Sequence, residues 1–455
     1  MLCVQVPAGR EAERRYIVEV LLGEFLGLEH QLLVGPGATY RLEQEGKVLE
    51  LPDCFLGMPE EHWLEPCSLP PQPLRSARPN LEALLARPEV PVLYGQDPLY
   101  RPTEQGGFLG LDVFGSAFFM LSRYEEVVRR ERDSFDRFPA RASLAYQEGF
   151  LDRPIINEYL ELLFCAMREL WPGLQRKQRS FSVKVGHDVD EPYRYAIDSP
   201  YILARRCARD LSRRPTPAGI LSTLTRIARV KAGNLAIDPY DTFDRIMDLG
   251  ERLNLKSAFY FFAHSGPDDG QYNVLHPCIR SLARKIHRRG HEVGLHASFA
   301  TYDNPDQMTL EVRRLVSIMA EEGVRQERWG NRQHYLRWKT PNTFENLERA
   351  GISYDATLGY PERIGFRCGV CYDYPAFSLG QRRALKLRVH PLTAMEISVF
   401  HYPYMNLGTT PRALQAMLAL KATCRRFEDE FRLLWHNNTL ASPVEFDLYR
   451  GLLEA

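Results

Sequence analysis

Short apolar runs and longer amphipathic runs alternate along the chain from about residue 180 onward. The apolar runs predict strands at 181–187, 257–262, 291–296, 333–337, 352–356, 386–398 and 431–436. Apolar residues at helical spacing between them predict helices at 240–253, 276–289, 306–322 and 341–350. This alternation is typical of parallel βα units, so seven such strands predict an α/β fold built on a sheet or a distorted barrel.

The preceding part of the chain lacks this alternation. Helical spacing over 11–28 predicts a helix, and short apolar runs at 39–44 and 47–51 predict strands. Six prolines between residues 68 and 92 indicate a linker or a surface crossing. We therefore predict an α+β region at 1–90, a second N-terminal domain at 91–178 that packs on the rest, and a third part at 179–455. Neither N-terminal part offers a nucleophile–base pair or a phosphate loop.

The overall charge of the 455 residues is balanced, with 58 basic and 58 acidic side chains. The balance indicates no nucleic-acid partner. It does, however, conceal a local patch of basic residues in an insertion at about 195–237. Residues 205–231 of this insertion combine helical apolar spacing with one acid, Asp210, and eight basic residues: Arg205, Arg206, Arg209, Arg213, Arg214, Arg226, Arg229 and Lys231. A segment of this kind can lie on an anionic membrane surface or bind a phosphate-bearing substrate. The alternative is a helical lid whose charges are only solvated.

The compartment is expected to be the cytoplasm. The first residues lack the apolar core of a secretion signal, and no stretch reaches the ~20 apolar residues that span a bilayer. Nine cysteines without regular spacing suit a reduced protein better than a disulfide framework. The pair Cys368 and Cys371 has no partner motif that would complete a zinc site.

Polar side chains follow several of the predicted strands. Asp188 and Asp190 end the first strand, and their spacing places both on one face, where a cation, a proton or a reacting group would offset their repulsion. His296 ends the third strand, and imidazole with carboxylate suits zinc or another divalent ion. Arg337 is suited to orient a carboxylate. His436 leaves the last strand in a position for proton transfer. Carboxyl ends of parallel strands share one edge, so we expect these residues to form one site.

The same motifs resemble the polysaccharide deacetylase (NodB homology, carbohydrate esterase family 4) superfamily over about residues 180–440. The stretch GHDVDEP stands where that family has Thr-Phe-Asp-Asp-Gly-Pro, and GHEVGLHAS matches its Gly-His-Glu-Ile-Gly-x-His motif. LGERLNLKSAFYFF is similar to the family's second-strand region, LRWKTPNTFENLERAGISYDAT to its Arg-containing motif, and FRLLWHNN to its final Leu-x-His strand. Residues 93–175 resemble the uncharacterised domain that often precedes divergent members.

The resemblance implies a seven-stranded distorted (β/α) barrel and metal-assisted removal of an N-acetyl group from an amino sugar. By position, Asp188 would be the general base and Asp190 a ligand of a divalent metal, zinc being expected, although the two roles are interchangeable. His296 would be a second metal ligand. Arg337 would position the base, and His436 would be the general acid.

One departure from the family's pattern concerns the metal. The family's second motif ends in a histidine where this chain has Ala300, and Ser298, Tyr302, Asp303 or a water would have to replace it. An altered metal site, a metal-independent relative and a sugar-binding domain without catalysis all remain open. The two functions to separate are a deacetylase of a glycan or glycan precursor and a catalytically inactive carbohydrate-binding or scaffold protein of cell-surface polysaccharide assembly.

Overall fold

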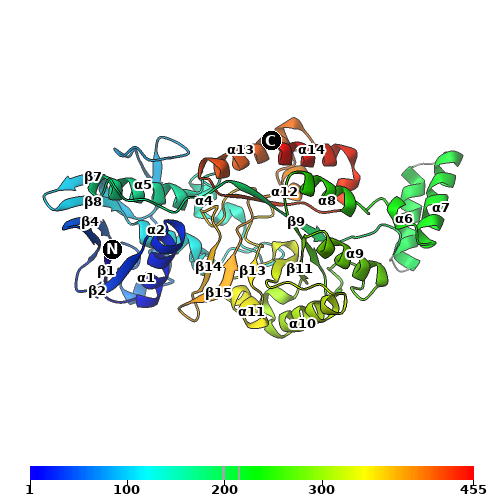
Figure 1. The fold of residues 1–455 in the computed structure, drawn as a ribbon, viewed down its shortest axis with the longest axis horizontal. Helices are drawn as coiled ribbons and strands as arrows, with labels where there is room; N and C mark the ends of the chain where they lie inside the picture. The colour runs from blue at the N-terminus through cyan, green and yellow to red at the C-terminus, as the bar shows by residue number, and fades with distance from the viewer. Residues whose placement is uncertain (197–199, 214–215) are drawn as a thin grey trace.

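The structure is a computed structural model that describes residues 1–196, 200–213 and 216–455. In these ranges it is a mixed α/β protein with two large sheets, and a small third sheet pairs β5 (Arg75–Ala77) with β6 (Val90–Val92) (Figure 1). The α/β class predicted from the sequence is confirmed.

The first sheet has six strands in the order β2-β1-β3-β4-β8-β7. Its strands are β1 (Leu2–Pro7), β2 (His30–Gly35), β3 (Thr39–Gln44), β4 (Lys47–Pro52), β7 (Gly95–Thr103) and β8 (Gly106–Leu111). The accompanying helices are α1 (Glu11–Val18), which continues as the π-helix η1 (Glu19–Phe25), α2 (Val113–Leu121), α3 (Glu125–Val128), α4 (Leu144–Gln147) and α5 (Ile155–Leu170). Because β4 pairs with β8, this sheet crosses residue 90, and the ranges 1–90 and 91–178 share it.

The second sheet has nine strands in the order β14-β15-β13-β12-β11-β10-β9-β17-β16. They are β9 (Ser182–Val189), β10 (Ser257–Phe261), β11 (Glu292–Ala297), β12 (Gly330–Gln333), β13 (Tyr354–Asp355), β14 (Tyr374–Ser378), β15 (Arg383–Val389), β16 (Ala394–Met395) and β17 (Glu430–Leu434). Neighbouring strands are parallel except β14 and β15. The expected seven-stranded barrel is thus observed as a nine-stranded sheet, whose edge strands β14 and β16 have one strand neighbour each among the described residues.

Helices connect and cover these strands. They are α8 (Phe243–Arg252), α9 (Pro277–Arg288), α10 (Pro305–Glu321), α11 (Asn342–Ala350), α12 (Glu396–Phe400), α13 (Pro411–Arg426) and α14 (Pro443–Glu454). Short 3-10 turns complete the described elements: η2 (Glu60–His62), η3 (Pro66–Ser68), η4 (Ala140–Ala142), η5 (Leu235–Ile237), η6 (Thr301–Asp303), η7 (His334–Leu336) and η8 (Thr439–Ala441).

Successive side chains of β9 point to opposite faces of the sheet, as strand geometry requires. His187 is buried on the outer face, where its ring lies 4.9 Å from that of Phe259. Gly186 and Asp188 lie on the opposite face, which we call the inner face. One cavity on this face is lined by Tyr354 of β13 and by Glu430, Arg432 and Leu433 of β17, so the sheet curls around it.

The fourth predicted strand, 333–337, is shifted. Strand β12 ends at Gln333, and the 3-10 turn η7 (His334–Leu336) follows it. Tyr335 and Leu336 have positive φ values of 58° and 53°, which extended strands do not contain. His334 therefore lies in a turn at the carboxyl end of the sheet.

The basic insertion forms a helical hairpin of α6 (Pro200–Arg213) and α7 (Pro217–Lys231), which extends from the body of the molecule (Figure 1). Arg214 and the side chain of Arg213 lie outside the described residues. Within the described ranges, no helix combines the length and the apolar character needed to cross a bilayer.

Candidate metal centre

Asp188 and Asp190 meet His296 at the carboxyl end of the second sheet. Nε2 of His296 lies 3.1 Å from Oδ1 of Asp190 and 3.7 Å from Oδ2 of Asp188. Asp188 and His296 are 3% and 1% exposed. The structure thus brings together three residues that the sequence placed at separate strand ends.

His296 presents Nε2 to the two carboxylates. Its Nδ1 donates to the carbonyl oxygen of Arg332 at 2.8 Å, which leaves Nε2 to face inward. Burial by itself would lower the pKa of His296, but the charges of Asp188 and Asp190 outweigh it and raise that pKa. A cation at this position would be stabilised by the same charges.

His334 is a second imidazole at this position, and the sequence did not single it out. Its Nδ1 lies 2.9 Å from Oδ1 of Asp269, in the loop after β10, and its Nε2 lies 4.0 Å from Oδ2 of Asp190. Asp269 also accepts a hydrogen bond from the backbone N–H of Phe299 at 2.7 Å. A carboxylate that holds the outer nitrogen of a histidine fixes the tautomer and orientation suited to metal binding.

Asp190, His296 and His334 form a group that we call the metal cluster. Their nearest ligand atoms all lie within 4.8 Å of one another. One carboxylate and two imidazoles form a donor set typical of zinc and other first-row divalent ions. Oδ1 of Asp190 and Nε2 of His296 are buried without a hydrogen-bond partner among the described residues, and this fits a cation between them.

The candidates that the sequence offered for the place of Ala300 are engaged elsewhere. The hydroxyl of Ser298 donates to Glu311, the hydroxyl of Tyr302 donates to Asp136, and Asp303 forms an ion pair with Lys339. His334 therefore offers the third ligand from a different loop.

His436 lies on the other side of Asp190. Its Nε2 is 3.6 Å from Oδ2 of Asp190, and its Nδ1 is 2.7 Å from Oε1 of Glu396, a fully buried residue. Burial lowers the pKa of His436, but Glu396 first, and then Asp190 and Asp188, raise it to about 10. The neighbouring carboxylates therefore favour the protonated form of this side chain.

Arg337 lies outside this group. Its guanidinium donates to the carbonyl oxygens of Phe135 at 2.7 Å and Phe299 at 2.8 Å. The guanidinium close to the predicted base is that of Arg332, whose Nε lies 3.8 Å from Oδ1 of Asp188.

A cavity of about 240 Å³, which we call the site cavity, opens over these groups. The N-terminal part contributes to its wall, because Arg137 lines it and donates to the carbonyl oxygen of Tyr335 at 2.7 Å. The ring of Phe135 stacks on that of Tyr335 at 5.2 Å. Five residues of this region escaped the sequence analysis: Arg137, Asp269, Arg332, His334 and Glu396.

Comparison with known proteins gives a family of unknown function (DUF7033), which matches residues 2–172. No curated protein matches the chain. Three solved structures are similar: a protein assigned as a polysaccharide deacetylase from Mycobacterium smegmatis, Puue allantoinase, and one assigned as a probable polysaccharide deacetylase from Pseudomonas aeruginosa PAO1. The M. smegmatis protein is 17% identical, covers 61% of this chain and 84% of its own, and has a TM-score of 0.40. The allantoinase is 12% identical, covers 60% and 83%, and has a TM-score of 0.37. The P. aeruginosa protein is 13% identical, covers 60% and 83%, and has a TM-score of 0.34. At these scores the similarity assigns no activity to this chain.

Proposed function

We propose that this protein is a metal-dependent hydrolase that removes an N-acetyl group from an amino sugar in a glycan or glycan precursor. The observation that carries the proposal is the metal cluster, which Asp188 and His436 flank. Asp190, His296 and His334 would hold a divalent ion, which would supply Lewis acidity for the hydrolysis. The residues of the chain then move the protons.

Asp188 is the proposed general base. Its Oδ1 is buried and accepts no hydrogen bond from the described residues, so it is available to take a proton from water as the water oxygen bonds to the acyl carbon. Arg332, rather than Arg337, is the proposed positioning residue for this base, because its guanidinium is the one that lies beside it.

His436 is the proposed general acid. It carries a proton on Nε2 toward the site cavity, and Glu396 holds its opposite nitrogen. When the carbon–nitrogen bond breaks, that proton passes to the departing nitrogen, which leaves as an amine while acetate forms. The charge of Glu396 stabilises the imidazolium before the transfer.

The surroundings support a substrate larger than the acetyl group. A neighbouring cavity of about 430 Å³ shares Arg137 and Tyr404 with the site cavity. Tyr402 is exposed and lies two residues before Tyr404, which lines both cavities. Aromatic rings of this kind offer apolar faces to ligands. We infer that the acetyl group enters the site cavity while the rest of the sugar lies toward the N-terminal part.

We infer a cytoplasmic location as part of the same proposal. All nine cysteines lie in the described ranges, and each has a free thiol. Free thiols without disulfides suit a reducing compartment.

The test is acetate release from N-acetylated glucosamine oligomers by the purified full chain, with and without a chelator. We expect activity that a chelator removes and that zinc, cobalt or manganese restores. Asp188→Asn and His436→Gln should each lower kcat by about 10²–10⁴-fold. His287→Ala, a partly exposed histidine on α9 that lines neither cavity, is the matched control and should leave kcat unchanged.

No acetate release with any added metal would reject the hydrolase. Glycan binding that survives Asp188→Asn and His436→Gln would then identify a catalytically inactive carbohydrate-binding protein.

A further inference from the structure

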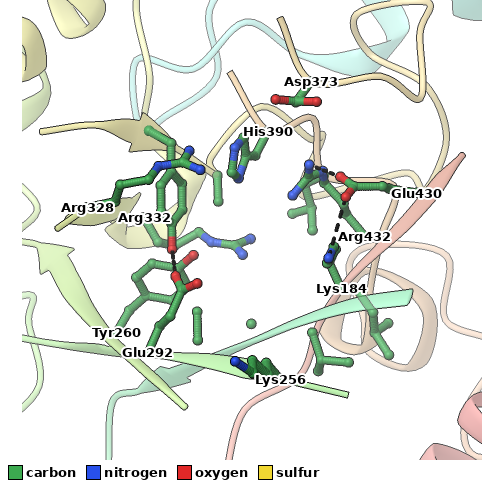
Figure 2. A pocket seen from close by; sticks show the side chains of 17 residues that line it. Lys184, Lys256, Tyr260, Glu292, Arg328, Arg332, Asp373, His390, Glu430 and Arg432 are labelled. Atoms are coloured by element: carbon green, nitrogen blue, oxygen red, sulfur yellow. Dashed lines mark hydrogen bonds and ion pairs between the residues drawn. The ribbon is translucent and has the colours of Figure 1, made fainter. Parts of the chain in front are cut away.

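A second cavity lies on the inner face, toward the amino-terminal ends of the strands (Figure 2). It measures about 230 Å³ and shares no lining residue with the site cavity, and we call it the basic cavity. On β9, Lys184 and Gly186 line the basic cavity, while Asp188 lines the site cavity. Side chains two apart on one face of a strand are ~7 Å from each other, so the two cavities are stacked along the inner face.

The basic cavity has an excess of positive charge. Its charged lining residues are the cations Lys184, Lys256, Arg328, Arg332 and Arg432 and the acids Glu292, Asp373 and Glu430. The acids are already engaged: Glu430 pairs with Lys184 and Arg432, Glu292 accepts from the hydroxyl of Tyr354, and Asp373 pairs with Arg388. Because Glu430 engages Lys184 and Arg432, the excess positive charge comes from Lys256, Arg328 and Arg332, of which Arg332 lies 3.8 Å from Oδ1 of Asp188. This excess is available to an anionic ligand.

Arg332 is the buried donor of this cavity. It is 3% exposed, and neither Nε nor Nη1 has a hydrogen-bond partner among the described residues. Its guanidinium lies over Gly186, where a Cβ atom would be 2.7 Å from Nη2, and Figure 2 shows it reaching into the cavity. Nε of Arg432 is also buried and unpartnered in the described ranges. Buried guanidinium donors without acceptors are costly, and a ligand with several oxygens would satisfy them.

We propose that the basic cavity binds an oxyanion of the phosphate class, either free phosphate or the phosphoryl group of a small metabolite. Arg332 is its buried donor and partly buried Arg432 offers a buried Nε, while Arg328 and Lys256, both exposed, also line it. Guanidinium forks match the oxygen spacing of phosphate, which favours phosphate over a halide. The basic cavity is separate from the site cavity, but Arg332 serves both, because it is also the proposed positioning residue for Asp188. Phosphate affinity is therefore measured apart from acetate release.

The experiment is calorimetric titration of the full chain with inorganic phosphate at constant ionic strength. We expect one saturable site, which Arg332→Gln and Arg432→Gln each weaken at least tenfold. Arg349→Gln, an exposed arginine on α11, is the matched control and should leave the affinity unchanged. If Arg332→Gln or Arg432→Gln fails to fold, the exposed Arg328→Gln takes its place and should weaken binding at least threefold.

Two further arms make the result specific. His296→Ala disrupts the metal cluster and should leave phosphate affinity unchanged; a loss there would put the anion at the metal cluster and overturn the proposal. Tighter binding of glucose 6-phosphate supports the metabolite form, whereas tighter binding of inorganic phosphate supports the free ion. Absence of saturable binding by both, or equal affinity in wild type and both buried variants, would overturn it.

Discussion

At the scale of single residues, His334 has the clearest experimental consequence. Asp190 and His296 lie at the ends of strands that the sequence predicts, whereas His334 lies in the 3-10 turn η7. Its Nδ1 atom is held by Asp269. We predict that His334→Ala weakens zinc binding at least 100-fold, because one of three protein ligands is lost. Asp269→Asn should weaken it 10–100-fold, the effect typical of removing an orienting partner.

The measurement is competition titration with a chromophoric zinc chelator on the purified full chain. Tyr302→Phe is the control, because its hydroxyl contacts Asp136 rather than the metal cluster. Zinc affinity that is equal in wild type and His334→Ala would remove His334 from the ligand set.

The sequence could identify four of the clustered residues but not the rest. Asp188, Asp190, His296 and His436 each follow an apolar run, so strand alternation was enough to place them at one edge. The position of His334 depends on the left-handed backbone of the two residues after it, which no apolar pattern encodes. The sequence predicts Arg337 as the positioning residue and does not single out Arg332, because the predicted strand 333–337 begins three residues after Gly330, where β12 begins.

At the scale of the strand, the inner face depends on small residues that leave room for large polar ones. A Cβ atom on Gly294 of β11 would lie 2.6 Å from a ring carbon of Tyr260, which is 2% exposed. We predict that Gly294→Ala lowers the free energy of unfolding by about 1–3 kcal/mol, the usual cost of overpacking. Chemical denaturation measures this, and Gly173→Ala, with no atom within 4 Å of its Cβ position, is the control. Equal stability of both variants would contradict the close packing.

The strand pattern of the second sheet could be predicted only in part. The apolar run 386–398 predicts one strand, but the chain divides there into β15, the two-residue β16 and the start of α12, with Pro391 between the two strands. Proline cannot donate to a strand ladder, so it favours such a break. The antiparallel β14 escaped notice because it lies in an irregular stretch after β13, outside the βα alternation.

At the scale of the helical hairpin, membrane contact stays a prediction. The hairpin of α6 and α7 exposes Leu221 and Leu224, at 67% and 48%, on a helix that also carries Arg226 and Arg229. Arg206 is instead used internally, since it pairs with Glu191 at 2.6 Å. We predict that the double variant Arg226→Glu and Arg229→Glu loses at least tenfold in binding to phosphatidylserine vesicles, at about 1 kcal/mol per basic residue.

Vesicle flotation measures this loss. The control is Arg412→Glu, an exposed arginine on α13, and neutral phosphatidylcholine vesicles should bind neither protein. Unchanged flotation of the double variant would leave the hairpin as a solvated lid.

At the scale of the whole molecule, the N-terminal part and the second sheet share one hydrophobic core, whose buried residues run from Leu2 to Leu453. A buried charge cluster crosses the same interface. Glu126 accepts hydrogen bonds from Arg123 at 2.9 Å and from Arg367 at 2.7 Å, and all three side chains are 1% exposed. A shared core and a paired charge cluster favour unfolding of both parts in one transition.

Removing the charge of Glu126 tests this coupling. Glu126→Gln leaves the buried guanidinium of Arg367 without its carboxylate and that of Arg123 with Glu125 alone, at 3.5 Å, so we expect a loss of about 3–5 kcal/mol in the free energy of unfolding. Burial would raise the pKa of Glu126, but Arg367 and Arg123 lower it below its ordinary value of 4.5. A lowered pKa in the folded state means that the stabilisation is present above pH 4.5 and is lost as the pH falls below it.

The wild type should therefore lose stability on acidification more steeply than Glu126→Gln, and the gap between them should narrow below pH 4.5. Denaturant unfolding from pH 7 to pH 3, followed by tryptophan fluorescence, measures both effects, and Glu131→Gln is the matched control because Glu131 is exposed. Two separate transitions in wild type, or a gap independent of pH, would show that the cluster does not join the two parts. A single transition that moves to lower denaturant concentration in Glu126→Gln would show that the N-terminal part and the second sheet unfold together. Arg137, which the N-terminal part contributes to the site cavity, would then be in place whenever the metal cluster is folded.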